Sequence, residues 1–480
     1  MRDLAHLALN QAQLAGAGYA DIRIVDRRFE TISIQDGELA GLSIDDSVGF
    51  GIRVLYDGSW GFAASATLTP EEVRRVAQEA VAIAKASRTV QRQAVDLGSS
   101  IHTVGRYETP VHEDPFAVSI EDKIALLLAA DAEMRAVPGI RATEASFACQ
   151  KEVKTFASTE GAFIEQVLIE TGCGINATAV DENEVQTRSY PNSFGRHQAT
   201  RGYELVREVD LVGNAQRIAE EAVALLKAPP CPSGITTLVL DPTQLALQVH
   251  ESIGHAIELD RVFGMEASFA GTSFLSPEMR DRFQYASPLV TVTADATLPG
   301  GLGSFGYDDE GVPAQRSPII EEGMFRGFLS SRETASKIGQ ASNGTMRADG
   351  WQRMPLIRMT NVNLEPGEHS FEQMIGEVED GIYMQTNKSW SIDDKRLNFQ
   401  FGCQIAWEIK KGKLGRILKN PTYTGITPEF WAGCDAIGDT SQWQIWGTPN
   451  CGKGQPGQVA HVGHGAAPAR FRNVRVGIFA

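Results

Sequence analysis

Two histidines and a glutamate within six residues are the strongest chemical signal in this chain. Residues 250–255 read His-Glu-Ser-Ile-Gly-His. In the common zinc-hydrolase pattern H-E-x-x-H, histidines at i and i+4 share one helical face and the glutamate is the general base. Here the second histidine stands at i+5, which turns it about 140° away from the first on a regular α-helix. One metal ion can therefore join His250 and His255 only if the helix widens or ends between them.

A helix start signal precedes the motif. Residues 237–240 read as a β-strand, and Asp241 as N-cap with Pro242 at the first helical position begins a helix. His250 then lies more than two turns inside that helix. Gly254 directly precedes the second histidine and lowers the barrier to a distortion such as a π-bulge. The sequence thus predicts a helix that follows a strand and widens or breaks near Gly254.

A catalytic zinc site needs a third protein ligand, because such sites take three protein ligands and keep one position for water. Cys451 stands in a glycine-rich segment, residues 447–457, whose composition indicates a loop rather than a regular helix or strand. A thiolate there would be a strong zinc ligand, and the nearby Lys453 would favour the deprotonated form. A buried, small apolar cysteine is the structural alternative, and it fits poorly among turn-forming neighbours. The residues leave five candidates open: Glu258, Asp260, Cys451, His461 and His464.

Other polar segments carry weaker signals. Residues 307–311, Tyr-Asp-Asp-Glu-Gly, could bind a cation, but a solvated acidic turn is the interpretation we favour. Residues 300–306 contain too many glycines at the wrong spacing for dinucleotide binding and predict a flexible loop. Neither Ser252 nor Ser304 has the G-x-S-x-G context of a serine hydrolase. The histidine motif therefore remains the main indication of chemistry.

The composition is that of a globular protein and disfavours several partners. A length of 480 residues suggests roughly two to four domains. The 47 glycines favour many tight turns and therefore substantial β structure. The net charge is −16, and no run is rich in lysine or arginine. This charge disfavours nucleic acids and anionic membranes as partners.

Targeting and redox signals point to the cytoplasm. The N-terminal residues 1–11 have polar residues inside an apolar stretch, which predicts an amphipathic helix rather than a signal peptide. No apolar run approaches the roughly 20 residues needed to cross a bilayer. The six cysteines are scattered without C-x-x-C pairing, which indicates free thiols in a reducing compartment. We therefore expect a cytoplasmic protein with no membrane partner.

A proline-rich stretch, residues 229–234, divides the chain into two regions. The first, residues 1–230, is an N-terminal α/β region of hairpin sheets and helices. The second, residues 231–480, is β-rich and carries the H-E-x-x-x-H helix. Because helices and strands are partly segregated rather than strictly alternating, we predict an α+β fold. In detail, we expect hairpin strands over 21–65 and 140–180, helices near 3–16, 70–84, 119–136, 211–228, 331–338 and 370–378, and an irregular segment over 92–118.

Two short segments of the N-terminal region match each other. Residues 79–86 read Glu-Ala-Val-Ala-Ile-Ala-Lys-Ala, residues 221–228 read Glu-Ala-Val-Ala-Leu-Leu-Lys-Ala, and each follows a strand-rich block. Duplication of an α/β unit would explain this match, and so would the alanine-rich composition of two unrelated helices. The pattern leaves both explanations open.

Several segments together resemble one family over nearly the whole chain. H-E-x-x-x-H on a helix, a distant Cys-Gly-Lys segment that begins at Cys451 and a β-rich C-terminal half are similar to the TldD/TldE (PmbA) family of zinc metallopeptidases. Further matching segments are residues 49–62, 309–316, 329–335 and 359–367. The combination of the histidine motif with the Cys-Gly-Lys segment is the specific part of the resemblance.

The resemblance implies a ligand set and an assembly. Zinc would be bound by His250, His255 and Cys451, and Glu251 would be the acid/base residue. The chain would be the TldD-like subunit that retains its metal, because TldE-like relatives lack the histidine ligands. Family members resemble two-fold dimers, formed with a TldE/PmbA-like paralogue or with a second copy, that enclose a cavity for unfolded or extended peptides. This chain departs from the family pattern in the residues after Cys451 and in two histidines of its tail.

We expect a zinc-dependent peptidase that hydrolyses peptide bonds in unfolded or extended peptides. Zinc-activated water would be the nucleophile, and Glu251 the general base and acid. A β edge in the C-terminal region would hold the substrate by strand addition. The segment we predict for this contact is Asn398, Phe399, Gln400 and Phe401.

Two other functions stay open. One is a non-catalytic peptide-binding or regulatory subunit that keeps a structural metal. Glu251 weighs against it, because a structural zinc site needs no general base. The other is a zinc amidase that acts on small molecules.

Overall fold

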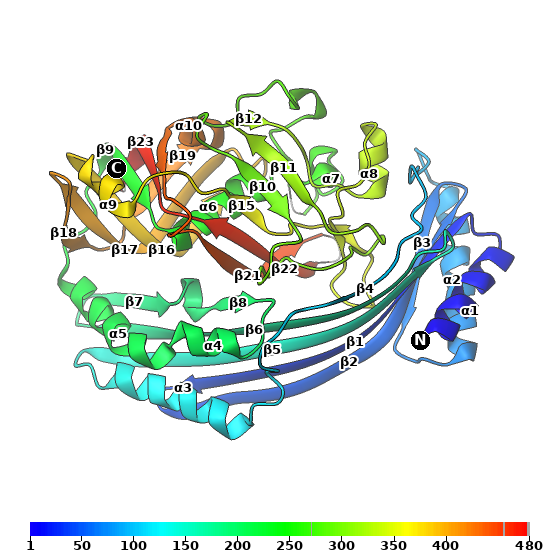
Figure 1. Cartoon of the computed structure of the whole chain (residues 1–480), viewed down its shortest axis with the longest axis horizontal. Helices are drawn as coiled ribbons and strands as arrows, with labels where there is room; N and C mark the ends of the chain where they lie inside the picture. Colours follow the sequence, from blue (N-terminus) through cyan, green and yellow to red (C-terminus); the bar gives the residue numbers. More distant parts are fainter. Residues whose placement is uncertain (270, 455–456, 478–480) are drawn as a thin grey trace.

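The N-terminal half of the chain forms one curved sheet, and the C-terminal half lies over it (Figure 1). The computed structural model describes residues 1–269, 271–454 and 457–477. The strands of this sheet are β1 (Tyr19–Gln35), β2 (Glu38–Tyr56), β3 (Ser59–Ser65), β4 (Val104–Glu108), β5 (Ile140–Ser158), β6 (Phe163–Val180), β7 (Val185–Tyr190) and β8 (His197–Ala199). Their order is β3-β2-β1-β5-β6-β4, with β7 and β8 also paired to β6. The long strands β1, β2, β5 and β6 are antiparallel neighbours and span the whole molecule.

Asp-Gly turns join the first three strands. Asp36 and Gly37, with φ of 52° and 88°, connect β1 to β2. Asp57 and Gly58, with φ of 46° and 77°, connect β2 to β3. Positive φ at both central residues gives a turn whose twist matches that of the flanking antiparallel strands. The hairpins predicted for residues 21–65 are confirmed.

Two groups of helices pack on the outer face of this sheet, one group at each end (Figure 1). The caps predicted at two of them are present, since Thr69 accepts from the Glu72 amide and Ser119 from the Asp122 amide. Three strands separate the helices of the first group and four strands separate α3 from α4, so the two units are similar but not identical in order, and the duplication stays a prediction. The helices are α1 (Arg2–Leu14) and α2 (Pro70–Arg88) at one end and α3 (Ile120–Arg135), α4 (Glu204–Val209) and α5 (Leu211–Lys227) at the other.

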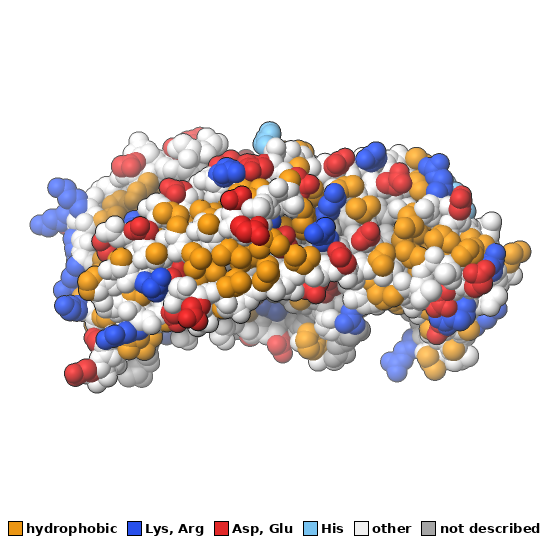
Figure 2. Space-filling model, turned by 90° about the horizontal axis from the view of Figure 1, so that it is seen from below, with side chains coloured by type: hydrophobic (Ala, Val, Ile, Leu, Met, Phe, Trp, Pro, Cys, Tyr) orange, Lys and Arg blue, Asp and Glu red, His pale blue; other side chains and the backbone are white. Residues whose placement is uncertain are grey.

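Between these helix groups, apolar side chains lie uncovered on the outer face of the sheet (Figure 2). Ile44, Val48 and Val153, which we call the apolar strip, are 41 to 44% exposed. They share one face, because Val48 and Val153 both stand opposite Asp26, and Ile44 stands opposite Glu30, at an even spacing along β1. The strip is part of the sheet face turned away from the C-terminal half.

The prediction of an irregular segment over residues 92–118 is wrong in part. Val104–Glu108 form β4, which runs parallel to β6 from Phe163 to Val167. This short polar segment has no strand pattern of its own, and it becomes a strand because β6 offers it an unpaired edge. Such a partner, about 60 residues further along the chain, is invisible to local periodicity.

The C-terminal half contains a closed ring of strands. The strand β16 pairs with both β9 and β17, and β9, β23, β19 and β17 follow one another, so these five strands close on themselves. The larger sheet consists of β9 (Gly234–Leu240), β16 (Asp380–Ile392), β17 (Asn398–Lys410), β18 (Lys413–Leu418), β19 (Thr422–Ile426), β20 (Cys434–Ile437) and β23 (Ala469–Val476). This half sits over the concave face of the N-terminal sheet (Figure 1).

Short strands and helices surround the ring. The helices and strands of the whole structure confirm the predicted α+β class. Within the described residues, no helix is both long and apolar enough to cross a membrane. The remaining strands are β10 (Val292–Asp295), β11 (Arg316–Glu321), β12 (Met324–Phe325), β13 (Met346–Arg347), β14 (Leu356–Ile357), β15 (Val362–Leu364), β21 (Gln444–Lys453) and β22 (Gln458–Ala466). The helices are α6 (Pro242–Val249), a π-helical turn (His250–Gly254), α7 (Leu259–Val262), α8 (Arg332–Lys337), α9 (Phe371–Gly376) and α10 (Thr427–Ala432).

The strand predicted to bind substrate by strand addition has no free edge. Residues 398–401 belong to β17, which pairs there with β16 on one side and β19 on the other. Phe399 and Phe401 are buried in the core beneath. The strand-addition prediction for Asn398, Phe399, Gln400 and Phe401 is therefore wrong. Its aromatic alternation reflects packing inside the ring.

The acidic segment at residues 307–311 is buried rather than solvated. The carboxylate of Asp309 lies 2.9 Å from Lys154 Nζ and 3.7 Å from an Arg23 nitrogen, and Glu310 lies 3.3 Å from Arg53. Burial raises the pKa of Asp309, but Lys154 and Arg23 outweigh this effect and hold the pKa below its usual value. These basic partners come from the N-terminal sheet, so the segment joins the two halves of the chain.

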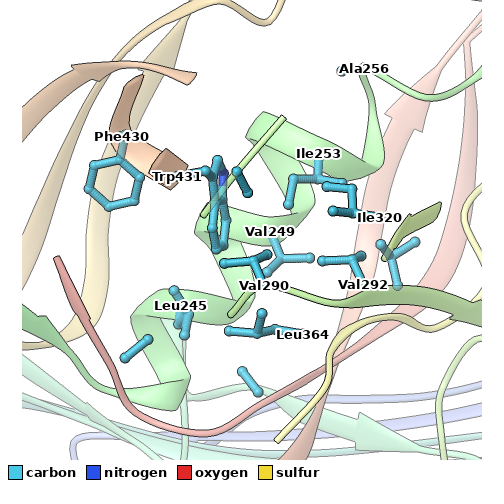
Figure 3. Close-up of a cluster of buried hydrophobic side chains, with 14 of the residues drawn as sticks. Leu245, Val249, Ile253, Ala256, Val290, Val292, Ile320, Leu364, Phe430 and Trp431 are labelled. Atoms are coloured by element: carbon cyan, nitrogen blue, oxygen red, sulfur yellow. The ribbon is translucent and has the colours of Figure 1, made fainter. Parts of the chain in front are cut away.

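A large apolar core fixes the helix that carries the histidine motif (Figure 3). Leu245 and Val249 of α6 and Ile253 of the π-helical turn are fully buried and point into a cluster that contains Trp431. The Trp431 indole donates to Ser252 Oγ at 2.9 Å, inside that turn. Each such apolar side chain contributes roughly 1.5–3 kcal/mol by burial. The motif is thus anchored in the buried apolar core of the C-terminal half.

We expect Trp431→Ala to lower the free energy of unfolding by about 3–5 kcal/mol, because it removes a fully buried side chain and leaves a cavity. Urea denaturation followed by circular dichroism measures the loss. The control Ile235→Ala, at a side chain 68% exposed, should change the free energy by less than about 0.5 kcal/mol. Equal stability of the two variants would contradict the anchoring role of Trp431.

Candidate metal centre

The helix widens where the i+5 spacing requires it. Residues His250–Gly254 form one π-helical turn that continues α6, and the His255 amide donates to the His250 carbonyl at 3.1 Å. The two imidazole centroids are consequently only 4.8 Å apart. The predicted widening near Gly254 is confirmed. Gly254 is also required by the available space, because a Cβ at this position would lie 2.2 Å from Met359 Sδ.

Three potential ligand groups converge beside this turn. His250, His255 and Cys451 are all buried, and each offers one ligand atom within 4.8 Å of the others. Cys451 Sγ lies 3.6 Å from His255 Nε2. Two imidazoles and a thiol form a nitrogen and sulfur donor set of the kind that zinc prefers. The residues present therefore fit a zinc ion, and one side of the cluster faces a cavity.

Hydrogen bonds behind the first histidine orient its ring. His464 Nδ1 lies 3.0 Å from the Val362 carbonyl oxygen, and His464 Nε2 lies 2.8 Å from His250 Nδ1. A carbonyl can only accept, so His464 carries its proton on Nδ1 and accepts from His250 Nδ1–H. The His250 Nε2 lone pair is thereby left for a metal. Burial is the main reason that the pKa of His464 lies well below its usual value, and the neighbouring His250 lowers it further.

A carboxylate does the same for the second histidine. His255 Nδ1 donates to Glu258 Oε2 at 2.9 Å, which directs Nε2 toward Cys451. Glu258 also lies 3.3 Å from both Lys453 Nζ and Arg261 Nε. Lys453 first, then His255 and Arg261, outweigh burial and keep the pKa of Glu258 well below its usual value. Burial lowers the pKa of His255, which favours the form of the ring whose lone pair can bind a metal.

The protein also favours the thiolate of Cys451. Burial by itself raises the pKa of this thiol, but His255 and Arg358 outweigh burial and lower it. The predicted neighbour effect of Lys453 is wrong. Its ammonium group instead donates to Asp260 Oδ1 and to the Ile357 carbonyl, both at 2.8 Å.

The prediction of an irregular loop around Cys451 is wrong as well. Gln444–Lys453 form β21, which pairs with β22, and the register shifts only between Thr448 and Cys451. Gly447 is explained by a close approach, because a Cβ there would lie 1.9 Å from the Gln198 carbonyl oxygen. Residues 455 and 456 of the predicted loop lie outside the described residues.

Of the five candidates for the third ligand, only Cys451 meets the two histidines. Glu258 and His464 stand behind the imidazoles, and Asp260 binds Lys453. His461 pairs with Glu170 of the N-terminal sheet.

Glu251 faces the same cavity as the ligand cluster. The cavity has a volume of about 290 Å³ and is lined by His250, Glu251, His255, Arg396 and Cys451 among others. Arg396 Nη1 donates to Glu251 Oε2 at 2.6 Å. The sequence contained no signal for Arg396, because it lies in the turn between β16 and β17, outside any motif.

A second cavity adjoins the first. Its volume is about 600 Å³, and Arg196, Pro449 and Asn450 line both cavities. Its floor is the concave face of the N-terminal sheet, where small and hydroxyl side chains such as Ser33 and Ser146 lie. The site therefore sits at the junction of the two halves of the chain.

Comparisons with known proteins agree over most of the chain. Residues 233–477 match the PmbA/TldA metallopeptidase C-terminal domain, residues 113–228 its central domain and residues 20–84 its domain 1. A protein of Methanothermobacter thermautotrophicus named "Metalloprotease" is 33% identical over 463 residues, which cover 96% of this chain and 95% of that one. A "Zinc metalloprotease TldD homolog" of Saccharolobus solfataricus is 21% identical, with 98% of both chains covered.

The same architecture occurs in a solved structure. The crystal structure of TldE from Thermococcus kodakarensis has a TM-score of 0.78 to this chain at 16% identity, with 99% of this chain and 100% of that chain covered. At this identity the likeness concerns the fold. The matched family models define the class of this protein as a metallopeptidase family. The chain belongs to the PmbA/TldA family, also known as TldD/PmbA, as its resemblance predicted.

We expect the wild type to hold about one zinc ion per chain and Cys451→Ser to lose most of it, because the substitution would remove one of three expected ligands. Elemental analysis of the purified protein measures the content. Cys231→Ser is the matched control, since Cys231 is a partly buried free cysteine outside the group of potential ligands, and it should leave zinc content unchanged. Unaltered zinc in Cys451→Ser would remove this residue from the ligand set.

Proposed function

We propose that this protein is a zinc-dependent peptidase that hydrolyses peptide bonds in unfolded or extended peptides. The observation that carries the proposal is the position of Glu251, a buried carboxylate on the wall of the cavity that the three ligand groups also face. Relatives named metalloprotease and zinc metalloprotease support it. His250, His255 and Cys451 would hold the ion.

The bound ion would supply Lewis acidity, which lowers the pKa of water and polarises a carbonyl group. The protein supplies the proton transfers. Glu251 would take a proton from the attacking water as its oxygen bonds to the carbonyl carbon. It would then return that proton to the amine nitrogen as the carbon–nitrogen bond breaks. Burial of His250, Glu251, His255 and Cys451 would limit their contact with bulk water during these steps.

The shape of the site supports an extended substrate. The two adjoining cavities, of about 290 and 600 Å³, share Arg196, Pro449 and Asn450 in their linings and together form a path between the halves of the chain. A peptide without ordered structure can follow such a path, whereas a folded domain is far larger. A small-molecule amidase would not need the second cavity.

We also propose a TldD-like role in a dimer, either with a TldE/PmbA-like paralogue or with a second copy. The retained histidine and cysteine groups support the TldD-like role, and the shared fold with a TldE supports such a paralogue as partner. The apolar strip on the outer face of the sheet adds a surface that a partner can cover (Figure 2). Light scattering after size exclusion is expected to give a mass of about twice the 52.1 kDa of one chain for the homodimer or for a pair of similar subunits. A monomer in the presence of the paralogue would contradict the dimer.

Glu251→Gln tests the catalytic role. We expect zinc content to stay unchanged and cleavage of an unstructured peptide to fall by at least roughly 100-fold, because an amide cannot take the proton of water. The control Glu379→Gln changes an exposed carboxylate in the same half and should cleave at the wild-type rate.

Three results separate the functions. Cleavage by Glu251→Gln at the parental rate would contradict the role of Glu251. A zinc-loaded wild type that binds peptide but never cleaves it, alone or with its paralogue, would favour the non-catalytic subunit. Loss of cleavage on chelation and its return with zinc would support the peptidase.

A further inference from the structure

We propose that Arg396 is a catalytic residue that donates hydrogen bonds to the substrate carbonyl oxygen as negative charge develops on it. The proposal rests on the proposed peptidase function and adds a residue that neither the motif nor the ligand set contains. Its basis is the position of the guanidinium group, on the wall of the metal cavity and in contact with the proposed general base.

The backbone holds Arg396 in place from both sides. Arg396 N donates to the Asp393 carbonyl at 2.9 Å, and the Asp393 carboxylate accepts from the Leu397 amide at 2.8 Å. Thr427 Oγ1 donates to the Arg396 carbonyl at 2.8 Å, and the Phe274 amide donates to the Lys395 carbonyl at 2.9 Å. The turn is therefore anchored to two other segments. A donor fixed before the reaction needs no reorganisation when charge appears.

The backbone conformation of Arg396 is itself informative. Its φ of 65° lies in the left-handed region, which favours glycine and strains other residues. Turn geometry alone would be better served by glycine or asparagine. A function of the side chain in the cavity would explain why an arginine occupies this position.

The side chain meets the reacting groups. It is 16% exposed and ends 2.6 Å from Glu251 Oε2, on the same cavity as His250, His255 and Cys451. A guanidinium is planar, always charged and presents five N–H donors in a fixed fork. It can thus contact the carboxylate and an oxygen of the substrate from one position.

Peptide hydrolysis creates the charge that such a group stabilises. As the water oxygen bonds to the carbonyl carbon, the carbonyl electron pair moves to the oxygen, which becomes negative. The carbon–nitrogen bond then breaks, and the proton taken by Glu251 passes to the nitrogen. Arg396 neither gives nor takes a proton in these steps. Its positive charge and N–H groups stabilise the oxygen most when the charge is greatest, which raises kcat rather than substrate affinity.

The first experiment separates kcat from KM in the zinc-loaded full chain, with its paralogue present if cleavage requires it. We expect Arg396→Ala to lower kcat roughly 100- to 1,000-fold, with KM changed by less than about threefold and zinc content unchanged. Arg396→Lys should keep part of the activity, because it retains the charge without the fork. Lys395→Ala alters the exposed neighbour in the same turn and should behave as the wild type.

A binding experiment distinguishes contact with the substrate from mere positioning of Glu251. The probe is a phosphinic peptide, whose tetrahedral anionic group mimics the charged intermediate state, compared with the parent peptide. Both are titrated calorimetrically into Glu251→Gln and into Glu251→Gln/Arg396→Ala. If Arg396 contacts the developing charge, its loss weakens the binding of the phosphinic peptide by roughly 100-fold and weakens the binding of the parent peptide far less. Equal weakening of both ligands would overturn the proposal.

The outcomes remain distinguishable. A wild type that never cleaves peptide refutes the proposed function, whereas a wild type that cleaves while Arg396→Ala retains its kcat refutes only the role of Arg396. If Arg396→Ala unfolds, Arg396→Lys replaces it in both experiments, and unchanged kcat and phosphinic-peptide affinity in that variant would contradict the need for the guanidinium fork. Partial recovery of kcat in Arg396→Ala on addition of guanidinium ions would support it.

Discussion

The hydrogen bond from the His255 amide to the His250 carbonyl, 3.1 Å long, closes the π-helical turn on which the whole site depends. On a regular helix the second imidazole would point about 140° away from the first. With one residue more in the turn, the two rings come within 4.8 Å of each other, and Glu251 between them faces the same cavity. The unusual motif spacing and the widened turn are therefore one constraint, seen first in the sequence and then in space.

A widened turn is less favourable than a regular helix, so the surroundings must hold it. Ser252, in its middle, accepts from the Trp431 indole, and its carbonyl accepts from the Tyr285 hydroxyl at 2.5 Å. Met359 packs where a side chain at Gly254 would otherwise lie. The same tertiary contacts that stabilise the ring of strands thus stabilise the local distortion, which couples the site to the core of the C-terminal half.

Local signals were sufficient for many elements of the fold. Asp241 and Pro242 begin α6, and the Asp-Gly pairs make the N-terminal hairpins, because each works through its own backbone conformation. Other elements depended on distant partners. The strand β4 exists because β6 offers an edge, and Asp309 is buried because Lys154 and Arg23 neutralise it from strands more than 150 residues away. Such partners leave no trace in local periodicity.

From the sequence we could predict the two histidine donors, the carboxylate that we propose as general base and the need for a widened helix between His250 and His255, because these follow from side-chain chemistry and from 3.6 residues per turn. The residues alone left five candidates for the third ligand, and the folded chain shows that Cys451 meets the histidines and that Arg396 contacts Glu251. These contacts could not be predicted because the residues are far apart along the chain. Cys451 lies 196 residues from His255, and Arg396 lies 145 residues from Glu251. Strand pairing and core packing bring these residues together in space, and no local spacing in the sequence predicts the contacts.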